Sequence, residues 1–226
     1  MRHRRLLVQV GVAGVLFGLL ALLVNNLAVN LIRTGLGLGF GWLGRPAGFA
    51  LAETALPYAP SDSYFWALII GWLNSLKVIV AGLLLATVLG VAAGSARSSG
   101  NRLLRSLAGG YVALIRQVPL LLQLLFWYFV AFLGLPSEPV GGLIRLSNQG
   151  IQLFGLNLSV EFCAVLVGLT VFTGASIAEI VRGGINAVPR GQWEAFRSLG
   201  LGEGLGLRRI VLPQALPAIL PALTSQ

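Results

Sequence analysis

Long apolar runs constrain this chain more strongly than any other feature of its sequence. A helix needs about 20 residues to cross a hydrocarbon core about 30 Å thick, and four runs are about that long or longer. They cover approximately 6–24, 65–94, 103–133 and 159–181. A fifth apolar segment, from about 210 onward, contains three prolines and is too short to span comfortably. The sequence therefore predicts an all-α fold, a polytopic membrane helix bundle with about five spans, of which the last is incomplete.

The composition supports this class and excludes several others. Hydrophobic residues make up 56% of the chain and charged residues 10%, whereas soluble domains have about 45–50% and about 25%. The 16 Lys and Arg residues outnumber the 7 Asp and Glu residues. They lie in short gaps between apolar runs, unlike a nucleic-acid-binding surface, so we expect no nucleic-acid partner. One cysteine and one histidine leave no internal disulfide and no Cys₂His₂ zinc site, and we expect no metal and no cofactor of the chain's own.

The first run is interpreted as a membrane anchor. It follows a basic start, as a signal peptide would, but the apolar region of a signal peptide is only about 7–15 residues long. Residues 6–24 exceed that length, and no clear cleavage site follows them. We therefore expect residues 1–30 to form an uncleaved transmembrane helix.

The arginines predict the topology. Cytoplasmic loops of membrane proteins carry an excess of Lys and Arg, so the basic start indicates a cytoplasmic N-terminus. Alternation then makes 31–64 and 134–158 external, and 95–102 and 182–209 internal. All the arginines except Arg116, which lies within the third run, divide into eleven internal and three external ones: Arg2, Arg4, Arg5, Arg97, Arg102, Arg105, Arg182, Arg190, Arg197, Arg208 and Arg209 against Arg33, Arg45 and Arg145. The glycine-rich segment 31–64 is expected to lie along the outer interface, and 65–226 to form the core.

A short amphipathic helix is predicted in the second internal segment. Pro189 is placed to begin it, and Gly200 to end it in the left-handed conformation. Trp193, Phe196 and Leu199 follow at three-residue spacing and form an apolar stripe. Such a helix can rest on lipid or dock in a groove of a cytoplasmic partner, and physical reasoning alone favours neither.

The same segment resembles the EAA loop of ABC importer permeases, which reads E-A-A, three residues, G, nine residues, I, one residue, L-P. The matching residues are Glu194, Ala195, Gly200, Ile210, Leu212 and Pro213. Phe196 replaces the second alanine. Flanking stretches resemble the polar amino-acid branch of this family: 178–185, 191–195, 212–216, and 116–123, which is close to R-N-x-P-L-L-x-Q.

The extra first helix and the glycine-rich external segment resemble the permeases for general L-amino acids. The resemblance covers essentially the whole chain, and it implies an ATP-driven importer subunit in the bacterial inner membrane without catalysis of its own. Members of the family continue past the equivalent of Gln226, so we expect the chain to be C-terminally truncated.

The resemblance also implies the partners. These are an ABC ATPase subunit that binds ATP, a second, paralogous permease that makes a heterodimer, a periplasmic amino-acid-binding protein, and membrane lipid. The sequence agrees that ATP binds elsewhere, because a Walker A loop needs Gly-Lys-Ser/Thr and the only lysine, Lys77, follows Leu76. The implied ATPase-coupling residues are Glu194, Ala195 and Gly200, with Trp193 and Phe196 as apolar anchors.

Three polar residues are predicted to share a layer near the membrane midplane, where transporter sites tend to lie. At 1.5 Å per residue, Lys77 lies about 17 Å, and Gln123 and Thr170 about 15 Å, from the outer ends of their helices. Lys77, which is costly in lipid, either faces the pathway and attracts the substrate carboxylate, or snorkels or pairs structurally. Thr173 is a weaker pathway candidate.

Arg116 and Glu179 come out deeper, at about 26 and 29 Å, and are predicted to form an ion pair that braces the inner gate. Pro119 is expected to kink the third run, with the turns ahead of Arg116 at the inner surface.

Two other classes compete with the importer subunit. An ion-coupled secondary carrier would need a membrane-embedded acid near the midplane, whereas Glu161 and Glu179 lie near opposite ends of their helix. A membrane enzyme would need a histidine base or metal ligands, and His3 is in the N-terminal tail. Recruitment of an ATPase subunit would separate the first class from both.

Overall fold

The computed structural model describes residues 2–35, 39–54 and 56–225. The chain divides into two compact units, Met1–Phe49 with Ala59–Ala67, and Ala50–Tyr58 with Leu68–Gln226. The predicted external segment 31–64 is therefore split between the units, because residues 50–58 contact the helices of the second unit.

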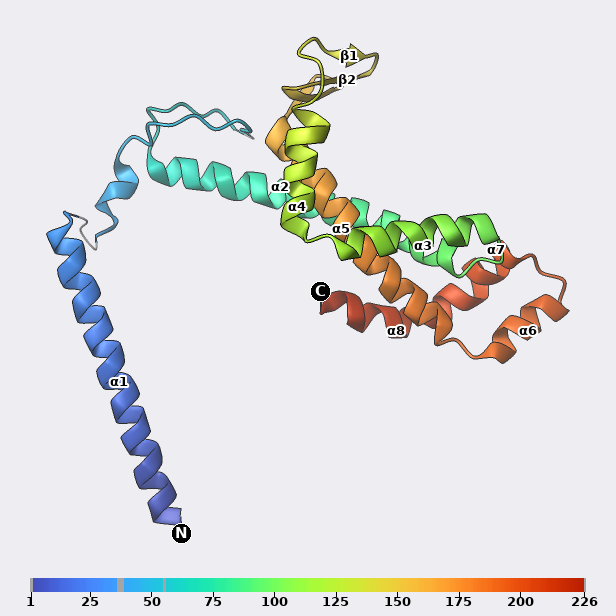
Figure 1. Ribbon diagram of the computed structural model, residues 1–226, viewed down its shortest axis with the longest axis horizontal. Coiled ribbons are helices and arrows are strands. Elements are labelled where there is room, and N and C mark those ends of the chain that lie inside the picture. The colour runs from blue at the N-terminus through green and yellow to red at the C-terminus, as the bar shows by residue number, and fades with distance from the viewer. Residues whose placement is uncertain (1, 36–38, 55, 226) are drawn as a thin grey trace. The chain divides into compact units, whose positions relative to one another are not determined.

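The first unit contains the N-terminal helix α1 (Arg2–Arg33), which Figure 1 shows as one long, nearly straight helix. Its stretch Val8–Arg33 is long and apolar enough to cross a membrane. A short 3₁₀ helix, η1 (Phe40–Gly44), follows. Aromatic rings then gather around Tyr64, whose ring centroid lies 5.5 Å from that of Trp42 and 6.1 Å from that of Phe49.

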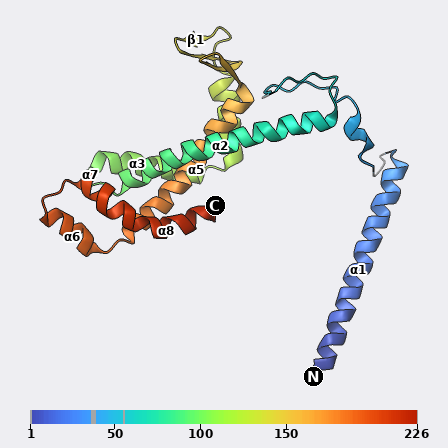
Figure 2. The ribbon, with the colours of Figure 1, turned by 180° about the vertical axis from the view of Figure 1, so that it is seen from behind.

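The second unit is built mainly from helices. They are α2 (Tyr64–Arg97, whose first four residues belong to the first unit), α3 (Arg102–Gln117), α4 (Leu120–Leu125), the π-helical η2 (Phe126–Phe132) and α5 (Val160–Asn186). After α5 come α6 (Arg190–Ser198), α7 (Glu203–Gly206), the π-helical η3 (Leu207–Val211) and α8 (Leu212–Thr224). Figure 2 shows α6, α7 and α8 grouped around the end of α5.

The number of spans matches the prediction only roughly. Among the described residues, three helices are long and apolar enough to cross a membrane, and a fourth span is possible if α3 and the following helix count as one. The predicted last span corresponds to α8, which has 13 residues and contains Pro217 and Pro221. The all-α membrane architecture is confirmed.

The predicted kink in the third run is confirmed and is sharp. Helix α3 and the helix from Leu120 to Phe132 meet at 104° across Val118 and Pro119. Proline has no N–H to continue a helix, and it disfavours the helical conformation of the residue before it. The buried side chain of Gln123 stabilises the bend, since its Nε2 donates to the carbonyls of Ile115 (2.8 Å) and Val118 (2.9 Å).

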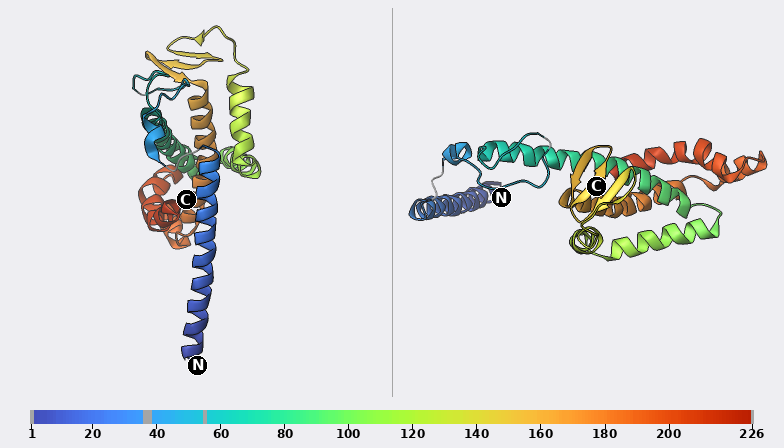
Figure 3. Two further views of the ribbon diagram at one scale, coloured as in Figure 1. Left: turned by 90° about the vertical axis from the view of Figure 1, so that its left-hand side faces the viewer. Right: turned by 90° about the horizontal axis from the view of Figure 1, so that it is seen from above.

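A small antiparallel sheet, which was not predicted, precedes α5. Its strands lie in chain order: β1 (Val140–Gly141), β2 (Ile144–Ser147), β3 (Gly150–Leu153) and β4 (Leu156–Ser159). The turn between β3 and β4 has φ of 47° at Phe154 and 84° at Gly155. Two consecutive positive φ values are typical of the tight turns that join hairpin strands. Figure 3 shows the sheet at the ends of η2 and α5.

Helix α5 is the centre of the second unit. Helix α2 packs on it at Gly90 and Gly94, where a Cβ would lie 2.5 Å from Ile177 and 2.7 Å from the Ala178 carbonyl. The spacing of these glycines is therefore explained by close helix packing. The similar pair Gly14 and Gly18 differs, because no described atom lies within 4 Å of a Cβ placed there.

Candidate functional site

Helix α6 forms where the sequence predicts it. Pro189 is its N-cap residue, with extended backbone, and the helix runs from Arg190 to Ser198. Gly200 follows with φ of +66°, the left-handed conformation in which glycine pays no Cβ penalty. These bounds confirm the predicted helix.

Phe196, predicted as an apolar anchor for the ATPase, lies instead inside the chain's own core. Its side chain is 0% exposed and belongs to a cluster with Val181, Ile185 and Val211. A Cβ at Gly206 would overlap its ring, so glycine there makes room for the phenylalanine. The prediction that Phe196 is offered to a partner is wrong for this structure, because a three-residue stripe shows which face is apolar but not what covers it.

Trp193 is half-buried on the same cluster. Its ring centroid lies 5.7 Å from that of Phe196, and the Arg197 guanidinium lies 5.8 Å from both rings. The indole therefore contributes mainly to the seating of α6 on the core and only partly to its outer surface.

The other predicted coupling residues form the outer surface of α6. Glu194, Ala195 and Gly200 are exposed, as is Leu199, which is 75% exposed. No described side chain pairs with the Glu194 carboxylate; only its backbone carbonyl is used, by the hydroxyl of Ser198 at 2.9 Å. This surface therefore offers an unpaired acid beside small and apolar groups.

A carboxylate connects the α6–α7 segment to the loop between α2 and α3. Glu203 Oε1 lies 3.4 Å from Arg197 Nη2, and Glu203 Oε2 accepts a hydrogen bond from the backbone N–H of Gly100 at 3.0 Å. A displacement of α6 would act on this loop, and through it on the two helices that the loop joins.

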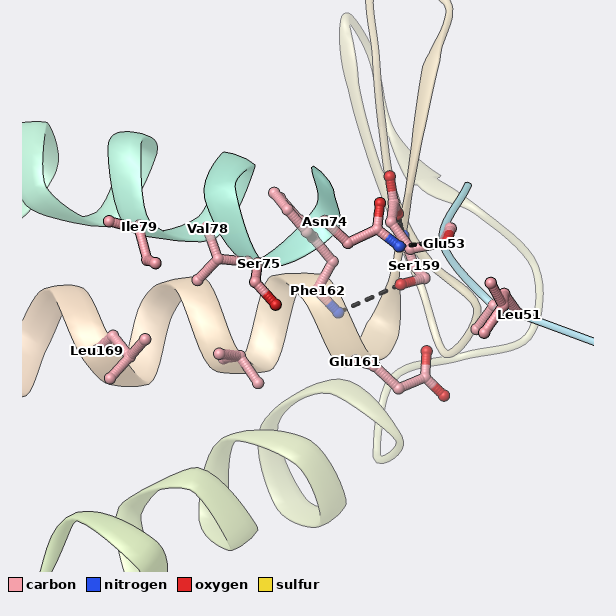
Figure 4. A pocket seen from close by; sticks show the side chains of 12 residues that line it. Leu51, Glu53, Asn74, Ser75, Val78, Ile79, Ser159, Glu161, Phe162 and Leu169 are labelled. Carbon is pink, nitrogen blue, oxygen red and sulfur yellow. Dashed lines mark hydrogen bonds between the residues drawn. The ribbon is translucent and has the colours of Figure 1, made fainter. Parts of the chain in front are cut away.

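On the other side of the unit, Glu53 connects the 50–58 segment to two helices. Its carboxylate accepts from Lys77 Nζ of α2 at 3.1 Å and from the Ser159 N–H, just before α5, at 2.9 Å. Its carbonyl accepts from Asn74 Nδ2 at 2.6 Å (Figure 4). The Lys77 ammonium also lies 5.8 Å from the ring centroid of Phe162.

Glu53, Asn74, Ser159 and Phe162 line an open cavity of about 520 Å³ between α2, α5 and the 51–53 segment, whereas Lys77 is not part of its lining. Its walls are mainly apolar, and Figure 4 shows that Glu161 points away from the contact between Asn74 and Glu53. The polar groups at its rim are two carboxylates, an amide and hydroxyls: Glu53, Glu161, Asn74, Ser75 and Ser159.

Lys77 does not lie in the common layer that was predicted for it with Thr170. Through Glu53, the Lys77 ammonium lies close to the start of α5, whereas Thr170 lies 11 residues further along that helix, about 16 Å away. The prediction assumed that α2 stands upright. With 34 residues it is about 51 Å long, longer than a membrane core, so residue counts along it do not measure depth.

Thr170, Thr173 and Gln123 also share no hydrogen-bond partner among the described residues. The hydroxyl of Thr170 is buried without a hydrogen-bond partner among the described residues, and Thr173 is half-buried. Gln123 is used by the bend described above, although its Oε1 is buried and unpartnered in the described part of the chain. No single polar site contains the four predicted pathway residues.

Arg116 and Glu179 do meet, but within a larger cluster. Arg116 Nη1 lies 3.8 Å from Glu179 Oε2, and Arg182 Nη2 lies 3.1 Å from Oε1. Arg97 of α2 forms a closer pair with the same carboxylate. The cluster therefore joins α2, α3 and α5. Arg97 could not be predicted as part of it, because it lies 82 residues from Glu179.

The fold is that of a polytopic membrane subunit of the permease kind. It has apolar helices of spanning length, a sharply bent third run and a short amphipathic helix ahead of α8. The chain belongs to the family of binding-protein-dependent transport system inner membrane components, whose profile matches residues 86–226. The matched part includes α6 and the arginine cluster, and it excludes Glu53 and Lys77.

Named relatives extend the similarity to nearly the whole chain. The chain is 32% identical to the putative amino-acid ABC transporter permease protein YhdX of Escherichia coli K12, over 92% of this chain and 74% of the relative. It is 30% identical to the general L-amino acid transport system permease protein AapQ of Rhizobium johnstonii, over 100% of this chain and 77% of that relative. A crystal structure of an amino acid ABC transporter with histidines is similar, with a TM-score of 0.52 and 31% identity over 72% of this chain and 66% of that one.

Proposed function

We propose that this chain is the transmembrane subunit of an ATP-driven importer that moves L-amino acids across the bacterial inner membrane, with its N-terminus in the cytoplasm. The observation that carries the proposal is the outer surface of α6, with Glu194, Ala195 and Gly200 exposed at the positions of the EAA pattern. The substrate class is supported by the relatives, whose names describe amino-acid permeases.

The proposal includes three partners. An ABC ATPase subunit docks on α6 and binds the ATP, a second permease completes the pathway, and a periplasmic binding protein delivers the amino acid. The contacts of Glu203 support a mechanical role for α6, because they connect its segment to the loop between α2 and α3. ATP-dependent movement of the ATPase would thereby reach the helices that border the pathway.

Uptake into proteoliposomes tests the function. The chain is co-reconstituted with a candidate ATPase, second permease and binding protein, and uptake of labelled L-amino acids is measured with ATP supplied to the ATPase side. We expect uptake to require ATP and to persist when ionophores collapse all ion gradients. Uptake that follows an ion gradient and continues with an ATPase whose Walker A lysine is replaced would instead establish a secondary carrier.

The role of Lys77 is decided by comparing it with its partner. If Lys77 attracts the substrate carboxylate, Lys77→Met raises KM for uptake about 3- to 10-fold, an energy of about 0.7–1.4 kcal/mol. Glu53→Gln then leaves KM unchanged or lowers it, because it frees the ammonium. We expect this pattern, with assembly of the complex unchanged.

The alternative is that the ion pair of Lys77 and Glu53 only holds the 50–58 segment in place. Both substitutions would then raise KM by the same factor, and the double variant would be no worse than either. Unchanged uptake kinetics of Lys77→Met would rule out a substrate role.

A further inference from the structure

The arginines around Glu179 carry more positive charge than its single carboxylate neutralises. Three guanidinium groups, from Arg97, Arg116 and Arg182, surround one carboxylate. Arg182 Nε is buried without a hydrogen-bond partner among the described residues. Arginine has five N–H donors, so most of the donors in this cluster are not used by Glu179. The cluster therefore has both the charge and the donors to bind a further anion.

There is space for that anion. A cavity of about 310 Å³ lies between α2, α3 and α5, and it is lined by Arg97, Arg116 and Glu179 together with Val112, Ala113 and Gln117. Arg116 is the residue most open to it, since its side chain is 51% exposed and approaches Glu179 only to 3.8 Å. A group in the cavity can reach Arg116 without first breaking a tight ion pair.

Helix α3 indicates where this cavity lies in the membrane. Leu103, Leu107 and Leu114 are 67%, 64% and 65% exposed, and their spacing of four and seven residues places them on one face of the helix. Arg102, Arg105 and Arg116 are three and eleven residues apart and lie on roughly the opposite face.

The leucine face of α3 is therefore the one open to acyl chains, whereas the opposite face packs on α5 through Arg116 and the buried Val112. Arg97 is the last residue of α2, and Arg182 lies four residues before the end of α5. In the orientation proposed above, these are the internal ends of the two helices, at the level of the lipid phosphates of the inner leaflet.

We propose that Arg97 and Arg116 of this cluster bind the phosphate of an anionic phospholipid of the inner leaflet, while Arg182 stays paired with Glu179. The placement rests on the orientation proposed above. Basic pockets between helices on the cytoplasmic side suit such head groups, and the planar fork of arginine matches two phosphate oxygens. A lipid is favoured over a soluble phosphate because the proposed orientation places the cavity at the level of the inner head groups, and the exposed leucines of α3 place acyl chains against the same helix. The bound phosphate joins α2 and α3 through one shared anion.

Lipid retention tests this proposal. The protein is purified into nanodiscs of phosphatidylcholine that contain a tenth phosphatidylglycerol, and the bound phosphatidylglycerol is counted by native mass spectrometry. We expect Arg116→Gln to lower retention at least about fivefold, the effect of roughly 1 kcal/mol. Arg105→Gln is the matched control, because Arg105 is an exposed arginine on the same face of α3 that does not line the cavity. It is expected to change retention by less than about twofold.

Ala113→Leu is a second variant, which fills the cavity without changing the charge. It is expected to lower retention as Arg116→Gln does, while thermal unfolding shows that both variants remain folded. Equal losses in Arg116→Gln and Arg105→Gln would mean diffuse attraction and would overturn the proposal. Inorganic phosphate that binds the cluster in pure phosphatidylcholine, or that displaces the lipid at millimolar concentration, would overturn it as well. Lipid retention is independent of transport, so this test can fail while the proposed function stands.

Discussion

Glu194→Arg is expected to abolish recruitment of the ATPase while the permease remains folded. The Glu194 carboxylate is exposed and pairs with no described side chain, so reversing the charge of this side chain disturbs no contact within the unit. At an interface, losing one member of a desolvated charge pair costs about 2–5 kcal/mol, and reversal adds repulsion. The amount of ATPase that co-purifies should fall at least about 30-fold, since about 1.4 kcal/mol corresponds to a factor of ten.

The matched control for this experiment is Glu138→Arg. Glu138 is also exposed, but it precedes β1 in the segment proposed to be external, so its reversal should leave ATPase recruitment unchanged. Gly200→Glu is a second test, because it places a charged side chain on the same outer surface of α6. An intact Glu194→Arg protein that retains its ATPase would contradict the docking of the ATPase on α6.

The features that could be predicted from the sequence are those set by local chemistry. Pro189 and Gly200 bound α6 because one fixes the start of a helix and the other accepts φ of +66° at its end. The bend at Pro119 follows from the missing N–H of proline. Each of these predictions needed only residues within one or two turns.

Contacts between distant segments could not be predicted in this way. Glu53 lies 24 residues from Lys77 and 106 residues from Ser159, and no periodicity connects them. The depth estimate for Lys77 failed for the same reason, because the direction of a long helix depends on what packs against it. The small sheet was missed since its strands have two to four residues, too short for a clear alternation.

Phe196 shows most clearly how the tertiary structure changes the meaning of a pattern. Sequence reasoning placed it on the docking surface because it replaces an alanine in a stripe with Trp193 and Leu199. The helices that follow α6 cover it, and Gly206 leaves the space for its ring. The two residues therefore act as a pair, one large and one small, and the pair can be tested as such.

Phe196→Ala is expected to destabilise the protein by about 3–5 kcal/mol, because it leaves a cavity in a fully buried cluster. Gly206→Ala is expected to cost about 1–3 kcal/mol, since its Cβ overlaps the ring and forces the core to shift. In the double variant the ring is absent, so Gly206→Ala should add no further cost. The coupling between the two sites is then about 1–3 kcal/mol, in the range for residues in contact.

Thermal unfolding of the detergent-purified protein measures this cycle, and Trp193 reports on it because its ring centroid lies 5.7 Å from that of Phe196. Gly204→Ala is the matched control: it lies in the same short helix as Gly206, and nothing lies within 4 Å of its added Cβ. It should be neutral, or stabilising by up to about 1 kcal/mol. If Gly206→Ala destabilised the Phe196→Ala background as much as the parent protein, the overlap with the ring would not be the cause of the loss, and the Phe196 ring would not pack against Gly206.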